Sequence, residues 1–253
     1  MTLPVLKVCG LSVGGRLTSF CAEVPAGQLI HVIGPNGAGK STLLSCLAGI
    51  MAGEGEITLE GRPLTAFTAG ALAQRRAYLP QQVMPGALMP VFQYLSLHQP
   101  PAALPEALDD AIGFLCHALM LEDKLRRPLS QLSGGEWQRV RIAAVCLQIW
   151  PALNARARLL LLDEPMASLD IAQQAAVDGL IEYLVGSGIS VIASAHDINH
   201  TLHHARRVWM LKNGVLMAQG ATENIMVPDN LSRLFNMSFT QVENGDKRWL
   251  LYG

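Results

Sequence analysis

The sequence predicts an α/β fold built on a mixed, largely parallel core sheet. Residues Gln28–Ile33 are apolar and rich in strand-forming side chains, end at a glycine loop, and lead into a helix-like run over Ser41–Ala48. Farther along, Leu159–Leu162 and Ile189–Ala193 have the composition of strands buried on both faces, with a helical segment, Ile171–Leu184, between them. Buried strands that alternate with helices are typical of a parallel sheet.

Other segments predict parts that flank this sheet within one domain over residues 1–253. Gly55–Gly61 alternates apolar and polar side chains between glycines, which indicates a small antiparallel β subdomain. Residues Leu104–Leu147 are mainly helix formers, with proline-rich loops before and within them, so we expect a helical subdomain over about 84–150. Two strand-like runs flank Asn244 and Gly245, a strong hairpin signal, and predict a C-terminal helix plus β-hairpin over about 222–253.

Composition excludes several classes of protein. The net charge is −1 and no Lys/Arg cluster occurs, so we expect no nucleic-acid partner. Hydrophobic residues make up 50% and charged residues 15%, below the usual share of about 25%, which favours a protein partner. No apolar run approaches the length that spans a bilayer, and the start lacks a signal-peptide pattern, so we expect a soluble or peripheral protein in the cytoplasm. The five cysteines lack CxxC spacing, which argues against a disulfide framework or a zinc ribbon.

A glycine-rich loop carries the strongest chemical signal. Residues Gly34–Ser41 satisfy G-x-x-x-x-G-K-[ST] between a predicted strand and a predicted helix, as phosphate binding requires. Backbone N–H groups and the helix N-terminus would surround the phosphates of ATP, Lys40 would reach the β- and γ-phosphates, and the Ser41 hydroxyl would ligate Mg²⁺. The expected ATP-binding residues are Gly34, Pro35, Asn36, Gly37, Ala38, Gly39, Lys40, Ser41 and Thr42.

Two carboxylates end a predicted buried strand. Asp163 and Glu164 follow Leu159–Leu162, at the carboxyl end of the strand, where parallel sheets present their sites. One carboxylate can hold the metal's water shell, and the other can polarise the water that attacks the γ-phosphate. Strand-end acids also occur merely to satisfy a helix N-terminus, but the phosphate loop makes the catalytic interpretation the stronger one.

A third motif decides between classes of nucleotide-binding protein. Ser133 and Glu136 form an S-x-x-E capping box, which on its own requires only a helix start. The double glycine between them costs helix stability and indicates a backbone that approaches something closely. With the residues around it, Leu132–Arg139, this stretch resembles the signature motif of ATP-binding-cassette ATPases, in the order expected for them.

The resemblance covers nearly the whole chain and implies a P-loop NTPase cassette. It implies a Q-loop glutamine at Gln81, a Walker B aspartate at Asp163, a catalytic base at Glu164 and a switch histidine at His196. It places Mg²⁺ on Ser41, Gln81 and Asp163. It also places the D-loop at Ser168–Asp170, with Asp170 as its site residue, and the signature at Ser133, Gly134, Gly135 and Glu136. In this family the signature of one subunit covers nucleotide held by another, which implies a head-to-tail homodimer.

Three features depart from that pattern or stand outside it. The usual adenine-stacking aromatic is missing: Phe20 lies too near the core strand, while Arg16 could cover the ring by a cation–π contact. His200, His203 and His204 follow His196 at helical spacing, which allows a metal site, but no carboxylate joins them at ligand spacing and a polar helix face is favoured. His31, inside an apolar strand, is expected to be a core histidine.

The tail, Leu231–Leu251, resembles that of the ATP-binding subunits of bacterial iron-chelate and cobalamin importers. Four further stretches resemble the cobalamin importers more closely: Gly34–Leu44, Pro90–His98, Gln131–Val145 and Asp197–Leu202. That implies an ATPase at the cytoplasmic face of the inner membrane, under two permease subunits and indirectly served by a periplasmic substrate-binding protein. A ferric-siderophore or haem importer is the alternative. A soluble DNA-repair cassette is disfavoured because the phosphate loop and the signature lie close together along the chain, and a translation factor is disfavoured because the chain carries only one set of motifs. The apolar, proline-flanked run Val83–Pro90 predicts a docking surface for the permease, with Met84, Met89, Phe92 and Tyr94 as either contacts or core.

Overall fold

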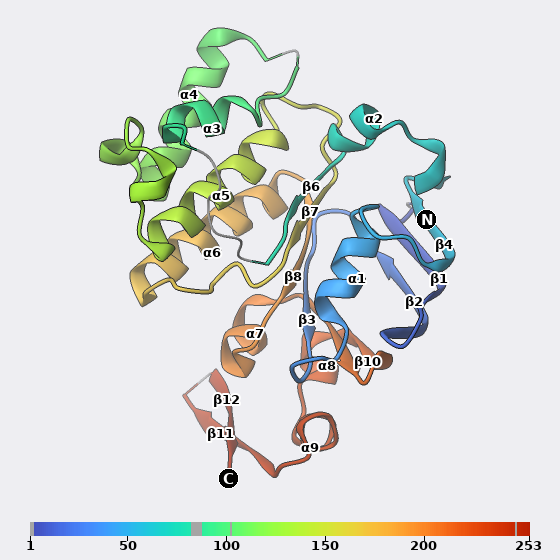
Figure 1. Cartoon of the computed structure of the whole chain (residues 1–253). Coiled ribbons are helices and arrows are strands. Elements are labelled where there is room, and N and C mark those ends of the chain that lie inside the picture. Colours follow the sequence, from blue (N-terminus) through green and yellow to red (C-terminus); the bar gives the residue numbers. More distant parts are fainter. Residues whose placement is uncertain (1–2, 82–87, 102, 246) are drawn as a thin grey trace.

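A six-stranded mixed sheet forms the centre of the chain, as the sequence predicts. The computed structural model describes residues 3–81, 88–101, 103–245 and 247–253 (Figure 1). The strand order is β10-β9-β3-β8-β7-β6, with parallel pairing throughout except between β9 and β10. The strands are β3 (Leu29–Ile33), β6 (Arg76–Leu79), β7 (Leu159–Leu162), β8 (Ser190–Ser194), β9 (Arg207–Lys212) and β10 (Val215–Ala221).

Strands β3, β7 and β8 are buried along their entire length because different layers cover the two faces of the sheet. Alternate side chains point to opposite faces. Leu160 and Leu162 therefore pack against helices α3 (Val91–Ser96), α4 (Pro105–Ala118), α5 (Gly134–Gln148) and α6 (Ile171–Gly186), whereas Leu159 and Leu161 pack on the other side. Figure 1 shows these four helices gathered on one side of the sheet and α1 on the other.

The second face is covered by α1 (Lys40–Leu47) and a small antiparallel sheet. This sheet has the order β2-β1-β4-β5, with β1 (Leu6–Val13), β2 (Leu17–Val24), β4 (Glu54–Leu59) and β5 (Arg62–Pro63). Strand β4 matches the predicted half-exposed strand. Short helical turns η1 (Leu64–Ala66) and α2 (Ala69–Ala73) lead from it back to the core sheet, while η2 (Glu122–Lys124) and η3 (Leu129–Gln131) connect α4 to α5.

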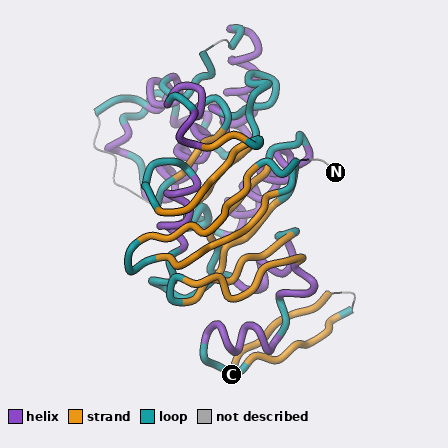
Figure 2. The backbone as a smooth tube through the Cα atoms, turned by 90° about the vertical axis from the view of Figure 1, so that its right-hand side faces the viewer, coloured by secondary structure: helices purple, strands orange, loops and turns teal. Residues whose placement is uncertain are grey.

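The last part of the chain packs at one end of the core sheet. Helices α7 (Ile198–His204), α8 (Thr222–Ile225) and α9 (Pro228–Phe235) precede a hairpin of β11 (Phe239–Asn244) and β12 (Lys247–Tyr252), which pair as the Asn-Gly signal predicts. In Figure 2 the hairpin lies at one end of the molecule, next to the C-terminus. The Asn199 side chain exchanges two hydrogen bonds with the Leu250 backbone and so ties α7 to β12. Within the described residues, no helix is both long and apolar enough to cross a bilayer.

Candidate nucleotide site

The glycine loop connects β3 to α1 and is held in place by close backbone contacts. A Cβ on Gly34 would lie 2.1 Å from the carbonyl oxygen of Leu211, so only glycine fits there. Gly39, with φ of 103°, is the N-cap of α1, and neither a side-chain cap nor an acidic residue occupies the first turn. The N–H groups at this helix start are therefore oriented to receive an anion.

Lys40 provides a buried positive charge at the centre of the loop. Its Nζ donates hydrogen bonds to the carbonyl oxygens of Gly34 (2.8 Å) and Pro35 (3.2 Å), and the residue is 6% exposed. Burial lowers the pKa of Lys40, while the carboxylates of Glu164 and Asp163 act in the opposite direction. A phosphate that enters the loop would therefore meet an ammonium group already turned inward.

A cleft of about 360 Å³ opens over this loop, within the size range of small-molecule sites. Residues from Asn36 to Thr42 line it together with Gln81 and Glu164. Two further residues, Gly15 and Arg16, border it from the turn between β1 and β2. The fold thus brings the predicted phosphate loop, glutamine and base to one cleft.

Asp163 has a free oxygen that fits a role next to a metal. The side chain is 1% exposed, and its Oδ1 accepts a 2.7 Å hydrogen bond from the Ser194 hydroxyl. Its Oδ2 is buried and has no hydrogen-bond partner among the described residues. Because a buried, unpaired carboxylate oxygen is costly, Mg²⁺ or a water in the shell of that ion would satisfy it.

Glu164 is fixed by its backbone and points at His196. Its φ of 52° is rare for a residue with a Cβ, and its N–H donates to the Ser194 hydroxyl at 2.8 Å. Its Oε1 lies 2.9 Å from His196 Nε2, which donates to the carboxylate. Ser194 therefore holds both acidic residues from β8, a role that the sequence did not reveal.

The start of α5 is linked to the same site by two buried polar side chains. The Gln138 amide donates to the carbonyl oxygens of Glu164 (3.3 Å) and Pro165 (3.0 Å). Arg141 donates to Gln138 Oε1 at 3.0 Å and to the backbone carbonyls of Pro80 and Gln81. These two residues join the backbone at Pro80 and Gln81 to the residues that follow strand β7. Gln138 lies within the motif found in the sequence, but nothing in its spacing indicated a partner.

The signature residues start α5 but do not line the cleft of their own chain. The predicted capping box is confirmed: Ser133 Oγ accepts from the N–H of Glu136, and Glu136 Oε2 accepts from the N–H of Ser133. A Cβ on Gly135 would lie 2.8 Å from the carbonyl oxygen of Ser168, which explains the need for glycine there. Asp170, just beyond this contact, is the N-cap of α6.

The departures noted in the sequence have structural answers. Phe20 is fully buried and packs edge-on against Trp209 at a centroid distance of 5.3 Å, so it is a core residue. Arg16 instead borders the nucleotide cleft. His31 is a core histidine, 2% exposed, whose Nδ1 lies 3.0 Å from the hydroxyl of Thr201.

The docking stretch predicted after Gln81 is only partly described. Residues 82–87, Met84 among them, lie outside the described residues. Of the others, Met89 packs against the helical core and Tyr94 packs on Trp137 at 5.0 Å, so both serve the core. Leu88 is 91% exposed and Phe92 is 50% exposed.

Comparisons with known proteins agree with this geometry. Residues 17–167 match the model of the ABC transporter family. The chain is 57% identical over 240 residues to the vitamin B12 import ATP-binding protein BtuD of Pectobacterium atrosepticum, covering 95% of this chain and 96% of that one. It is 52% identical to the protein of that name from Yersinia pseudotuberculosis, with 97% of each chain covered.

The chain belongs to the ABC transporter family. Its ATP-binding cassette makes it an ATP-hydrolysing transporter subunit, as the motifs predicted. Among solved structures, the cassette resembles a metal-chelate type ABC transporter in an inward-facing conformation, with a TM-score of 0.76 and 25% identity over 99% of this chain and 97% of the other. The mixed core sheet, antiparallel sheet and helical region are therefore those of an ABC cassette.

Proposed function

We propose that this ABC ATPase powers the uptake of vitamin B12 (cobalamin) across the bacterial inner membrane. The observation that carries the proposal is the 57% identity, over 95% of the chain, to a vitamin B12 import ATP-binding protein. Identity at this level extends beyond the motifs that all cassettes share.

In this proposal the loop residues from Gly34 to Thr42 bind the phosphates of ATP, and Lys40 changes partners from the loop carbonyls to the β- and γ-phosphates. This exchange should cost little free energy, because one set of charge-assisted hydrogen bonds to the Lys40 ammonium replaces another. Ser41, Asp163 and Gln81 would hold Mg²⁺, which when bound neutralises charge on the phosphates. The unpaired Asp163 Oδ2 supports this assignment.

Glu164 would act as the general base. As water attacks the γ-phosphorus, Glu164 takes its proton, and the bond to the β-phosphate oxygen breaks to give ADP and phosphate. His196 would contact the γ-phosphate and orient the carboxylate, and its 2.9 Å hydrogen bond to Glu164 supports the orienting role. Ser194 and Gln138 would fix the backbone on either side of the base.

The working unit would be a head-to-tail homodimer in which residues 1–253 of each chain form one cassette. Ser133, Gly134, Gly135 and Glu136 of one subunit would cover the γ-phosphate held by the other, next to Asp170. The location of these residues outside their own cleft supports a site completed by a partner. The dimer would lie at the cytoplasmic face of the membrane beneath two permease subunits, with a periplasmic substrate-binding protein delivering the vitamin.

Uptake in cells tests the proposal. A bacterium that lacks its own vitamin B12 import ATP-binding subunit would receive this chain on a plasmid, and accumulation of labelled cyanocobalamin would be measured. We expect uptake with the parent chain and none with Lys40→Ala. If the chain is expressed but fails there, and instead restores ferric-siderophore uptake in a second strain that lacks its siderophore-import ATP-binding subunit, the substrate assignment is wrong while the importer assignment stands.

A further inference from the structure

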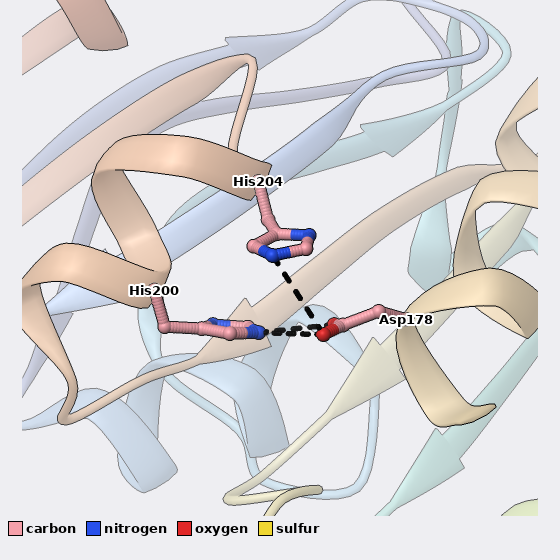
Figure 3. A group of neighbouring side chains, drawn as sticks. All are labelled: Asp178, His200 and His204. Carbon is pink, nitrogen blue, oxygen red and sulfur yellow. Dashed lines mark hydrogen bonds and ion pairs between the residues drawn. The ribbon is translucent and has the colours of Figure 1, made fainter. Parts of the chain in front are cut away.

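A second group of chemically active side chains lies outside the nucleotide cleft, between α6 and α7. Asp178 comes from α6, and His200 and His204 come from successive turns of α7 (Figure 3). His200 Nε2 lies 3.0 and 2.9 Å from the two Asp178 oxygens, and His204 Nε2 lies 3.9 Å from Oδ2. One ligand atom from each residue can be chosen so that all three are within 4.8 Å of one another.

We propose that Asp178, His200 and His204 form a binding site for a divalent transition-metal ion of the zinc class. Two imidazoles and a carboxylate are the donor set that such ions prefer over Mg²⁺ or Ca²⁺. Ligand atoms on a tetrahedral zinc ion are separated by about 3.3 Å, given metal–ligand bonds of about 2.0–2.2 Å. The existing contacts need only small shifts: the Asp178–His200 pair would open slightly, and His204 would move inward.

Hydrogen bonding between helices α6 and α7 does not explain why His204 lies next to the Asp178–His200 pair. The Asp178–His200 pair is complete by itself, with both carboxylate oxygens engaged. His204 is too far from Asp178 for a hydrogen bond, yet its ring stacks on that of His200 at 4.4 Å with an interplanar angle of 17°. A metal ion would use the second imidazole, once its ring tilts so that both Nε2 atoms converge.

The surroundings favour a cation with an open coordination position. The side chains of Asp178 and His200 are 12% and 17% exposed, whereas His204 is 33% exposed and leaves a route from solvent. On the inner side, His31 stacks on His200 at 5.7 Å. Three protein ligands leave at least one position for water.

The position of the site gives it a structural consequence. Helix α6 begins at the D-loop residue Asp170, and α7 begins two residues after His196, with Asp197 as its N-cap. An ion held between the two helices would clamp together the elements that carry the D-loop and the switch histidine. The sequence could not indicate this, because Asp178 is far from the histidines along the chain and only the packing of α6 on α7 brings it to them.

Zinc titration of the purified chain, made without a polyhistidine tag, tests the proposal. The exposed thiols of Cys9 and Cys21 would compete for zinc, so the background is the double variant Cys9→Ser, Cys21→Ser. Excess Mg²⁺ in every solution would compete with zinc at Asp163, the carboxylate of the proposed Mg²⁺ site. Calorimetry with Zn²⁺ gives affinity and stoichiometry, and Co²⁺ absorption in the visible range reports coordination geometry.

We expect one zinc ion per chain, and a rise in melting temperature of about 5–10 °C when free zinc exceeds its Kd a hundredfold. Asp178→Asn and His204→Gln should each weaken binding by about a hundredfold or more. His203→Gln is the matched control: His203 lies on the same helix but donates to the carbonyl of Arg248, and its substitution should leave the affinity unchanged. No zinc binding, or equal affinity in all variants that remain folded, would overturn the site without affecting the proposed transport function.

Discussion

At the carboxyl end of strand β7, the sequence predicted the two acidic residues but not the side chain that holds them. Asp163 and Glu164 follow a run of four leucines, and the motif predicts their place at the end of a buried strand. Ser194 carries no motif of its own and joins them only because β7 and β8 are neighbours in the sheet. Its hydroxyl donates to Asp163 and accepts from the Glu164 N–H, so it fixes both acids.

Replacing Ser194 by Ala should lower ATP turnover by about tenfold or more, because Asp163 and Glu164 lose the group that orients them. Leaving buried polar groups unpaired should also cost about 1–3 kcal/mol of unfolding free energy. Ser190→Ala is the matched control. Ser190 lies on the same strand and makes equivalent bonds to Pro25 and Gly27, so its loss should reduce stability similarly while turnover remains near the parental value. If phosphate release shows the same ATP turnover in both variants, Ser194 does not orient the two acidic residues for the reaction.

At the scale of elements, the sequence predicted the buried strands β3, β7 and β8, the helix α6 and the C-terminal hairpin, whereas it did not reveal β6 and β10. Helix α6 and strand β7 match their predicted ranges closely, since continuous apolar runs and capping residues mark them. Strand β6 alternates buried and half-buried residues over four positions, and β10 is mostly half-exposed, so neither has the continuous apolar run that marks β7. The double glycine at the start of α5 indicated a close backbone contact, but the sequence did not show that the partner is Ser168.

That contact gives a prediction for α5. Gly135→Ala would place a methyl group 2.8 Å from the carbonyl oxygen of Ser168, so the helix start and the D-loop must separate. We expect a lower melting temperature and a loss of ATPase activity. Gly113→Ala in α4 is the control: no atom lies within 4 Å of its Cβ, and the change should stabilise the chain by about 0.5–1 kcal/mol. If calorimetry shows that both substitutions change the melting temperature in the same direction, the proposed importance of this contact is wrong.

At the scale of the whole molecule, the cleft over the glycine loop is not lined by the predicted signature residues of the same chain. The order of motifs along the sequence predicted the fold, but the need for a second subunit came from the family resemblance. No spacing in one chain specifies which copy supplies the signature. A variant that alters the signature without disturbing its helix can test this directly.

Ser133→Asp should abolish ATP-dependent dimerisation while the chain stays folded. Aspartate is as good an N-cap as serine, so α5 keeps its capping box, but its negative charge would face the phosphates held by the partner. Light scattering in the Glu164→Gln background, with ATP and Mg²⁺, should give a mass near twice 27.3 kDa for Glu164→Gln alone and 27.3 kDa for the double variant. A double variant that still dimerises with ATP would show that this signature does not cover the partner's nucleotide.

Transport in purified vesicles tests the central claim most directly. The chain would be reconstituted with the permease and substrate-binding protein of a vitamin B12 importer, with ATP and Mg²⁺ on the cassette side and labelled cyanocobalamin on the other. We predict accumulation of the vitamin with matching phosphate release, and the loss of both with Glu164→Gln, since glutamine keeps the shape of the side chain but cannot take the proton. Phosphate release by an assembled complex that accumulates no cobalamin, or accumulation that persists in Glu164→Gln, would contradict the account.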